Sequence, residues 1–255
     1  MSRVELAYEE RGTGRPLVLL HAFPLSSAMW AGLSMPGRVI VPDQRGFGGS
    51  ALGEDAPSLG ECADDVLALL DRLGLDRVAL GGLSMGGYVA MELLRRAPER
   101  VAALLLADTK AQADTAEQRE GRLRTAETVE REGTAQLADT MLPALLGRTS
   151  LEARPEVVDR VRRWVGAATP ATVAWASRAM AARPDAFEVL RATDVPALVI
   201  VGDQDVLSPV ALAREMADAL PQGRLLVVPE AGHLSAVEDP EAFGAGVNDF
   251  LASAF

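Results

Sequence analysis

A serine in a glycine-rich turn is the feature that most restricts how this chain can fold. Residues 81–87 read Gly-Gly-Leu-Ser-Met-Gly-Gly, with Ser84 at the centre. A short, largely apolar run at residues 77–80 precedes the turn, and residues 88–96 follow it with helical spacing. A strand that turns sharply into a helix tolerates only very small neighbours, which Gly82 and Gly86 provide. The pattern therefore predicts a strained turn that lifts the Ser84 hydroxyl clear of a sheet.

The same turn lacks the marks of a phosphate site. No Lys-Ser or Lys-Thr pair follows Gly86, and the glycine spacing differs from that of the dinucleotide fingerprint. The helix that begins beside Ser84 directs unpaired N–H groups and a positive dipole end at the hydroxyl. We therefore interpret Ser84 as a candidate nucleophile.

Composition limits the partners and the compartment. The chain has 255 residues, of which 49% are hydrophobic, enough for one large α/β domain or a domain with an insertion. A net charge of −11 argues against nucleic acid and anionic membrane as partners and favours a neutral small-molecule substrate. The single cysteine, Cys62, excludes an internal disulfide and is typical of a reducing compartment, so we expect a cytoplasmic protein. No apolar stretch reaches membrane-spanning length, and the sequence leaves the oligomeric state open.

Short apolar runs alternate with helical patterns, which predicts an α/β fold with a mostly parallel sheet and helices on both faces. The expected strands are residues 4–8, 17–20, 38–41, 77–80, 101–107, 197–201 and 224–228. The expected helices are residues 26–33, 59–73, 86–96, 210–220 and 240–252, the second of them starting with a capping box of Ser58 and Glu61. Residues 110–192 show no convincing strand, and we expect three or four short helices there.

Polar residues follow several expected strands at the point where each strand ends. Ligands of an open parallel sheet bind at the carboxyl ends of its strands. Ser84, Asp205 and His233 each stand just after one of these strands, in that order along the chain. A serine hydroxyl is a weak nucleophile that needs an adjacent base, and the chain has only two histidines, His21 and His233. Two histidines and no acidic or cysteine cluster also argue against a metal site.

At these residues the chain resembles the α/β-hydrolase superfamily, and the resemblance covers nearly its whole length. Four separated places carry it: residues 21–24, residues 43–50, the turn at Ser84, and the pair formed by residues 202–205 and 232–233. The resemblance implies a core of residues 1–109 and 193–255, with residues 110–192 inserted as a helical cap. Within the superfamily it points toward carboxylesterases and enol-lactonases.

The resemblance also implies a role for each residue of the site. Ser84 is the expected nucleophile, His233 the base and Asp205 the acid that orients the base. The backbone N–H groups of Phe23 and Met85 are the expected oxyanion hole.

Each of these residues has a competitor. His21 is the alternative base, but it precedes the serine, and chain order favours His233. Asp203 and Asp108 are alternative acids. The family pattern favours Asp205 over Asp203, and an acid at Asp108 would leave the second aspartate motif without a purpose.

Further polar and apolar residues have two interpretations each. Asp43 and Arg45 read either as substrate-binding charges or as a buried loop network, and we favour the network. Four large side chains of the expected cap are candidates for an acyl pocket, with plain core as the competing interpretation: Met141, Trp164, Trp175 and Met180.

We therefore expect a cofactor-free serine hydrolase that cleaves a carboxylic ester, thioester or lactone of a small apolar acid through an acyl-enzyme. Relatives with the same triad perform C–C bond hydrolysis, enol-lactone opening or perhydrolysis, which are alternatives here. A non-catalytic ligand receptor on the same scaffold is a third hypothesis. A serine at the turn argues against epoxide hydrolase and haloalkane dehalogenase chemistry, which uses aspartate at that position in this superfamily.

Overall fold

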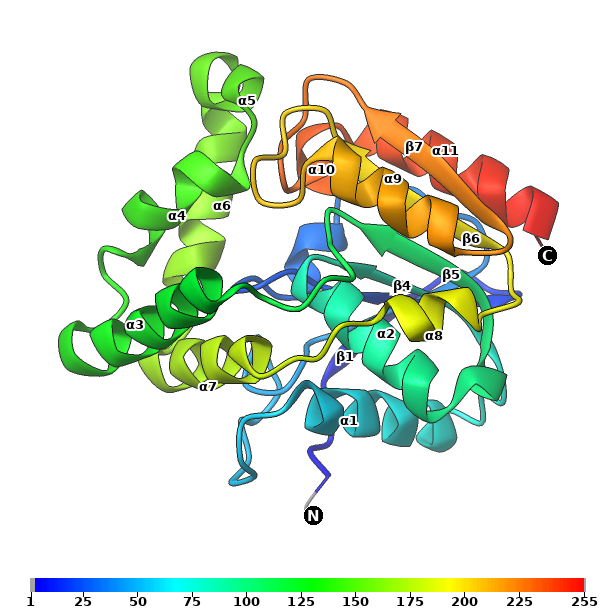
Figure 1. Cartoon of the computed structure of the whole chain (residues 1–255), viewed down its shortest axis with the longest axis horizontal. Helices are drawn as coiled ribbons and strands as arrows, with labels where there is room; N and C mark the ends of the chain where they lie inside the picture. The colour runs from blue at the N-terminus through cyan, green and yellow to red at the C-terminus, as the bar shows by residue number, and fades with distance from the viewer. Residues whose placement is uncertain (1–2, 255) are drawn as a thin grey trace.

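A seven-stranded sheet organises residues 3–254, which are the residues described by the computed structural model (Figure 1). The strands are β1 (Tyr8–Arg11), β2 (Pro16–Leu20), β3 (Arg38–Pro42), β4 (Val78–Leu83), β5 (Val101–Ala107), β6 (Ala197–Gly202) and β7 (Gly223–Val228). Their spatial order is β1-β3-β2-β4-β5-β6-β7. β1 runs antiparallel to β3, and every other neighbouring pair is parallel, so the predicted mostly parallel sheet is confirmed.

Helices cover both faces of this sheet. One face carries α1 (Leu59–Arg72), α2 (Met85–Arg96), α8 (Phe187–Arg191) and α9 (Val210–Ala219), and the short η2 (Pro98–Arg100) follows α2. The other face carries η1 (Ser27–Trp30), α10 (Ser235–Glu238) and α11 (Pro240–Ala254). In Figure 1, α9 lies in front of β6 and β7, and α11 lies behind them. Every residue of β4 and β6 is buried, as expected for parallel strands covered on both sides.

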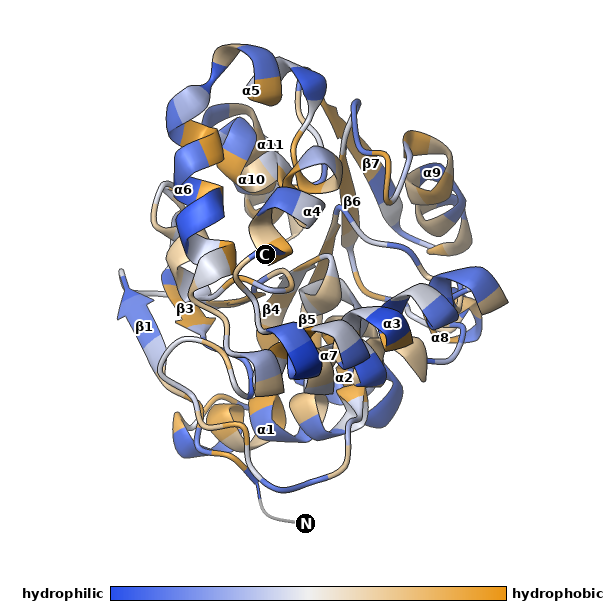
Figure 2. Ribbon diagram, turned by 90° about the vertical axis from the view of Figure 1, so that its left-hand side faces the viewer, coloured by the Kyte–Doolittle hydropathy of each residue, from blue (hydrophilic) through white to orange (hydrophobic). Residues whose placement is uncertain are grey.

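The remaining helices form a group beside the carboxyl ends of the strands, between β5 and β6 in the chain (Figure 1). They are α3 (Ala116–Glu132), α4 (Leu137–Leu145), α5 (Arg148–Ala153), α6 (Pro155–Gly166) and α7 (Pro170–Ala181). Figure 2 shows the central strands in the colours of apolar residues and α3 mostly in blue, since α3 buries only Ala126 and Val129. The division of the chain into a core and a cap at residues 110–192 stays a prediction.

Two details of this insertion differ from the expectation. Residues 110–192 contain six helices rather than three or four, and α3 spans 17 residues. Proline explains part of the difference. Pro155 and Pro170 stand in the first turn of α6 and α7, where a missing N–H costs nothing, so they begin helices instead of ending them.

Two local predictions near the N-terminus were wrong. The first strand is β1 rather than residues 4–8, because the backbone N–H groups of Val4 and Ala7 donate to the side chains of Asp65 and Ser50 at 2.8 and 2.9 Å. The capping box of Ser58 and Glu61 is also absent from α1. Ser58 accepts from the N–H of Gly60 at 3.1 Å, and the Glu61 carboxylate lies 3.8 Å from the buried Arg45 guanidinium.

No helix within residues 3–254 combines the length and the apolar character needed to cross a membrane.

Candidate active site

The turn at Ser84 joins β4 to α2 with a backbone that ordinary residues avoid. Ser84 has φ 55° and ψ −112°, in the positive-φ region that favours glycine. Its N–H donates to the Ala107 carbonyl at 2.9 Å, and the Thr109 hydroxyl donates to the Ser84 carbonyl at 2.9 Å. These bonds to β5 and to the segment after it hold the strained conformation, which costs about 1–3 kcal/mol.

The two glycines that flank this serine leave no room for a side chain. A Cβ on Gly82 would overlap the backbone of Gly86, and a Cβ on Gly86 would overlap the carbonyl of Leu20. Strand and helix therefore approach each other closely only because both positions are glycine.

Replacing Gly86 by alanine is expected to lower the free energy of unfolding by about 3 kcal/mol or more, because the new methyl group meets rigid backbone of β2. Urea unfolding followed by circular dichroism measures the loss. Gly166→Ala is the matched control, since nothing lies within 4 Å of its new Cβ. Equal stabilities of the two variants would contradict the predicted close approach.

Three side chains meet at the carboxyl edge of the sheet. His233 Nε2 lies 2.7 Å from Ser84 Oγ, and His233 Nδ1 lies 2.8 Å from Asp205 Oδ2. The loop after β6 holds Asp205. Its Oδ1 accepts from the N–H groups of Leu207 and Ser208 at 2.8 and 2.9 Å, and its Oδ2 accepts from the Ser208 hydroxyl at 2.7 Å. Ser84, His233 and Asp205 thus form one continuous hydrogen-bonded chain.

The electrostatics suit a base and its orienting acid. Burial opposes the charged form of His233, but the negative charge of Asp205 and its hydrogen bond outweigh burial and raise the pKa of His233. Burial likewise opposes the charge of Asp205, whose pKa is nevertheless held below its ordinary value by His233 and by the bonds from Ser208. Asp205 is therefore the ionised member of this pair.

The competing residues lie elsewhere or bond to other groups. His21 accepts at Nε2 from the Gln44 N–H at 2.9 Å, which leaves Nδ1 to donate to the Ala22 carbonyl at 3.0 Å. Burial lowers the pKa of His21 to about 4 despite the nearby Asp43. One ring nitrogen of His21 is thus bonded within the loop after β2 and the other to the loop after β3, so neither is available to Ser84. Asp203 is exposed.

Asp108 lies deeper, beneath the loops that carry the acid and the base. It is fully buried, and its Oδ2 accepts from the N–H and the hydroxyl of Ser235 at 2.9 and 2.6 Å. Its Oδ1 accepts from the Gly202 N–H at 3.0 Å. Burial and the charge of Asp205 raise the pKa of Asp108 to about 7. Asp108 therefore ties the two loops together and makes no direct bond to His233.

Asp43 and Arg45 are both buried and bonded to loop groups, in keeping with the favoured interpretation, but they belong to two separate sets of bonds. The Arg45 guanidinium lies 2.7 Å from Asp65 and 2.9 Å from Asp55. The Asp43 carboxylate accepts from the N–H groups of Ser27 and Gly49, each at 2.8 Å.

A cavity of about 340 Å³ opens onto Ser84 and His233. Phe23 lines it, and Met85 occupies the first position of α2 beside Ser84. Their assignment as oxyanion hole stays a prediction. Within the described chain, no group of three or more His, Cys, Asp or Glu side chains is placed to hold a metal ion.

Only part of the predicted acyl pocket lines this cavity. Met141 and Met180 do so. Trp175 lies elsewhere, with Nε1 donating to the Asp55 carbonyl at 2.9 Å, and Trp164 packs with Arg160 on α6. Helical spacing alone does not tell which face of a helix meets the cavity.

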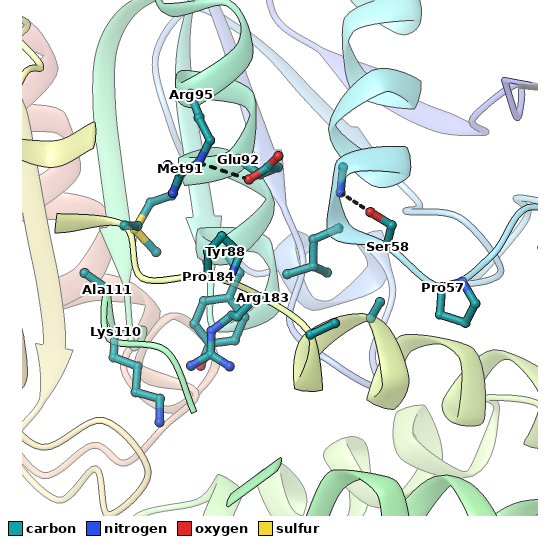
Figure 3. A pocket seen from close by; sticks show the side chains of 15 residues that line it. Pro57, Ser58, Tyr88, Met91, Glu92, Arg95, Lys110, Ala111, Arg183 and Pro184 are labelled. Carbon is teal, nitrogen blue, oxygen red and sulfur yellow. Dashed lines mark hydrogen bonds and ion pairs between the residues drawn. The ribbon is translucent and has the colours of Figure 1, made fainter. Parts of the chain in front are cut away.

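The cavity also has a polar wall, which was not predicted from the sequence. Lys110, Asp114 and Arg122 line it together with the apolar residues. A second cavity of about 210 Å³ lies behind this wall, shown in Figure 3, and shares Tyr88 and Lys110 with the first. The available signal was Lys110, the one lysine of the chain, which stands just after β5.

Comparison with known proteins confirms the predicted family. The α/β hydrolase fold family matches residues 15–240, so the chain belongs to this family. A solved thermophilic esterase from Thermogutta terrifontis (malate bound) has 41% sequence identity and a TM-score of 0.95, covering 98% of this chain and 94% of that chain. The enol-lactonase from Burkholderia xenovorans has 31% identity and a TM-score of 0.89, covering 98% and 97%. A pimeloyl-[acyl-carrier protein] methyl ester esterase from Nitrosomonas europaea is 31% identical over 251 residues, or 92% of this chain and 95% of that protein.

Proposed function

We propose that this protein is a serine hydrolase that cleaves a carboxylic ester, thioester or lactone of a small acid. The observation that carries the proposal is the hydrogen-bonded chain from Ser84 through His233 to Asp205, with distances of 2.7 and 2.8 Å. Two of the similar proteins named above are esterases and one is an enol-lactonase, which supports the same class of reaction.

In the proposed reaction, Ser84 Oγ attacks the substrate carbonyl while His233 Nε2 takes its proton. The Asp205 carboxylate holds the imidazole by Nδ1 and stabilises the imidazolium without accepting the proton. His233 then gives the proton to the leaving alcohol, thiol or lactone oxygen, which breaks the acyl bond. A water molecule, deprotonated by His233, hydrolyses the acyl-enzyme and restores Ser84.

The negative oxygen of the tetrahedral intermediate needs donors that are already in place. The N–H of Met85 at the start of α2 and the N–H of Phe23 are the proposed pair, and the positive end of the α2 dipole supports them. Losing one such donor typically removes about 3–4 kcal/mol of transition-state stabilisation.

A panel of short-chain p-nitrophenyl esters, acyl thioesters and lactones tests the proposal and ranks the three bond types. A fluorophosphonate probe followed by peptide mass spectrometry should place the label on Ser84. Labelling of Ser84 without turnover of any acyl compound would instead favour a ligand receptor. Labelling at another residue would contradict the assignment of Ser84 as the nucleophile.

The pH profile is expected to follow the charge of His233. Its pKa is raised above the ordinary 6.5, and only the neutral imidazole accepts a proton, so kcat/KM should fall as the pH drops through a value above 6.5. Stopped-flow or steady-state measurement of kcat/KM across the acidic and neutral range locates this limb. In Asp205→Asn the limb should move to lower pH, because the main attraction that raises the pKa is gone. A wild-type limb at or below 6.5 would contradict the assignment.

A further inference from the structure

Three basic side chains surround one carboxylate at the wall of the Ser84 cavity. Asp114 Oδ2 lies 2.5 Å from Arg122 Nε and 2.8 Å from Arg183, and Asp114 Oδ1 lies 3.2 Å from Lys110 Nζ. We refer to Lys110, Asp114, Arg122 and Arg183 as the basic cluster. It carries a formal charge of about +2 at neutral pH, because these three basic groups face a single acid. This local excess is unusual in a chain whose net charge is −11.

The cluster joins residues 110–122 to Arg183, which stands much further along the sequence. Lys110 and Asp114 stand between β5 and α3, Arg122 lies on α3, and Arg183 follows α7. Lys110, the chain's one lysine, also donates to Gln118 at 2.8 Å. Arg183 stacks on the Tyr88 ring at 4.0 Å, and Figure 3 shows the two side chains together, with Lys110 nearby.

The members of the cluster differ in their access to the cavity. The side chains of Lys110 and Arg183 are 7% and 4% exposed, whereas that of Arg122 is 25% exposed. Among the described residues that line the cavity, Lys110 and Arg122 are the basic ones and Asp114 the acidic one. Arg122 is therefore the cation with most freedom to meet a ligand.

Within the basic cluster, the single carboxylate of Asp114 does not balance three cations. Burial lowers the pKa of Lys110, and the charge of Arg183 lowers it further, against the attraction of Asp114. The charge of the basic cluster also acts on His233 of the proposed triad. Behind the larger effects of burial, Asp205 and Asp108, the positive charge of Arg122 acts to lower the pKa of His233. A bound anion at the cavity wall would offset this excess charge.

Apolar side chains complete the cavity. Leu137, Met141, Ala144, Leu145 and Met180 line it together with Ser84 and the basic residues. An acyl chain can therefore lie along apolar surface with its carbonyl at Ser84 and its far end at the cluster.

We propose that Arg122 and Lys110 form an anion-binding subsite, so that the substrate is an ester, thioester or lactone whose acid carries a second, negatively charged group such as a carboxylate. This inference rests on the proposed function and narrows its substrates from esters, thioesters and lactones of any small acid to those of an acid with a second negative charge. It replaces the small apolar acid expected from the sequence. Arg122 Nε donates to Asp114 and Nη1 contacts Met180 Sδ, while the guanidinium has five N–H donors in all. Its remaining donors can bond to a carboxylate, and such charge-assisted bonds are stronger than neutral ones.

Two esters that differ only in this terminal charge test the proposal. They are the p-nitrophenyl monoester of glutaric acid and p-nitrophenyl pentanoate, each corrected for spontaneous hydrolysis. In the wild type, the ratio of their kcat/KM values should favour the anionic ester and fall as salt is added. Arg122→Gln should lower that ratio about 10- to 100-fold, the range typical of a hydrogen bond to a charged group. Arg122→Lys should recover part of it.

Suitable controls lie on the same helix and in the same cluster. Arg124→Gln changes another α3 arginine, 64% exposed, and should leave the ratio as it is. Removing Arg122 still leaves Asp114 paired with Lys110 and Arg183, so the variant should fold, and a thermal unfolding curve checks this. If Arg122→Gln proves unfolded, Lys110→Gln is expected to shift the ratio in the same direction.

Binding without chemistry separates this inference from the proposed function. Isothermal titration of glutarate into Ser84→Ala should show binding that disappears in Ser84→Ala/Arg122→Gln. If the wild type hydrolyses neither ester, the proposed function fails, and the titration alone decides the subsite. An unchanged ratio in Arg122→Gln with active enzyme, or the absence of glutarate binding to Ser84→Ala, would overturn the anion-binding subsite.

Discussion

Ser84→Ala is expected to lower kcat for ester hydrolysis by about 10⁶-fold, the loss typical of removing the nucleophile from a triad. The reason is local and structural. Ser84 Oγ lies 2.7 Å from His233 Nε2, and the turn between β4 and α2 holds this hydroxyl in place. Initial rates with p-nitrophenyl butyrate measure the loss, with enzyme concentration matched by absorbance.

The control for this prediction is a serine in the same cavity. Ser177 lines the cavity and is buried, but it stands on α7, and no part of the proposed mechanism uses it. Ser177→Ala should keep kcat within about one order of magnitude of the wild type. His233→Ala should be about as damaging as Ser84→Ala, and the double variant should be little worse, because triad members act as a unit. Activity of Ser84→Ala within tenfold of the wild type would mean another nucleophile.

Asp205→Asn is expected to lower kcat by about 10⁴-fold, since the amide favours the wrong tautomer of the base. Asp205 Oδ2 lies 2.8 Å from His233 Nδ1, and an amide nitrogen there would turn the ring's donor into an acceptor. The raised pKa of His233 would also lose its main support. Steady-state kinetics and the pH profile measure both effects.

The same substitution at two other aspartates serves as the control for this prediction. Asp203→Asn should leave kcat nearly unchanged, because Asp203 is exposed. Asp108→Asn should weaken activity by roughly tenfold or less, through the loops that Ser235 and Gly202 anchor, because Asp108 makes no direct bond to the base. A larger loss in Asp108→Asn than in Asp205→Asn would assign the acid to Asp108.

The patterns that sequence analysis reads well are local ones. The strands that it placed near β2, β4, β5 and β6 are continuous apolar runs, and burial on both faces is what produces such runs. It was less successful at the N-terminus, where Val4 and Leu6 are buried and alternate as in a strand, but their segment bonds to side chains instead of a neighbouring strand. Alternating buried and exposed residues therefore occur both in a paired strand and in an extended segment that bonds to side chains.

Side-chain partners that are distant in the sequence were also hard to predict, because a local pattern does not show them. Trp175 looked like a pocket residue, yet its indole donates to the Asp55 carbonyl, 120 residues away in sequence. Glu61 on α1 looked like half of a capping box, yet its carboxylate lies near Arg45, which belongs to the loop after β3. In both cases the side chain interacts with a residue from another part of the chain instead of the local partner that the sequence spacing predicted. Spacing along one segment cannot identify such a distant residue.

By itself, the sequence determined the family, the mostly parallel sheet and the three residues of the proposed triad, because each depends on a short motif at the end of an apolar strand. Only the tertiary structure decided how Asp108 and Asp205 divide their partners and which side chains reach the cavity. It alone brought Lys110, Arg122 and Arg183 around Asp114. The physical reason is that charges on separate segments, such as Arg183 and Asp114, interact only after folding has brought those segments together.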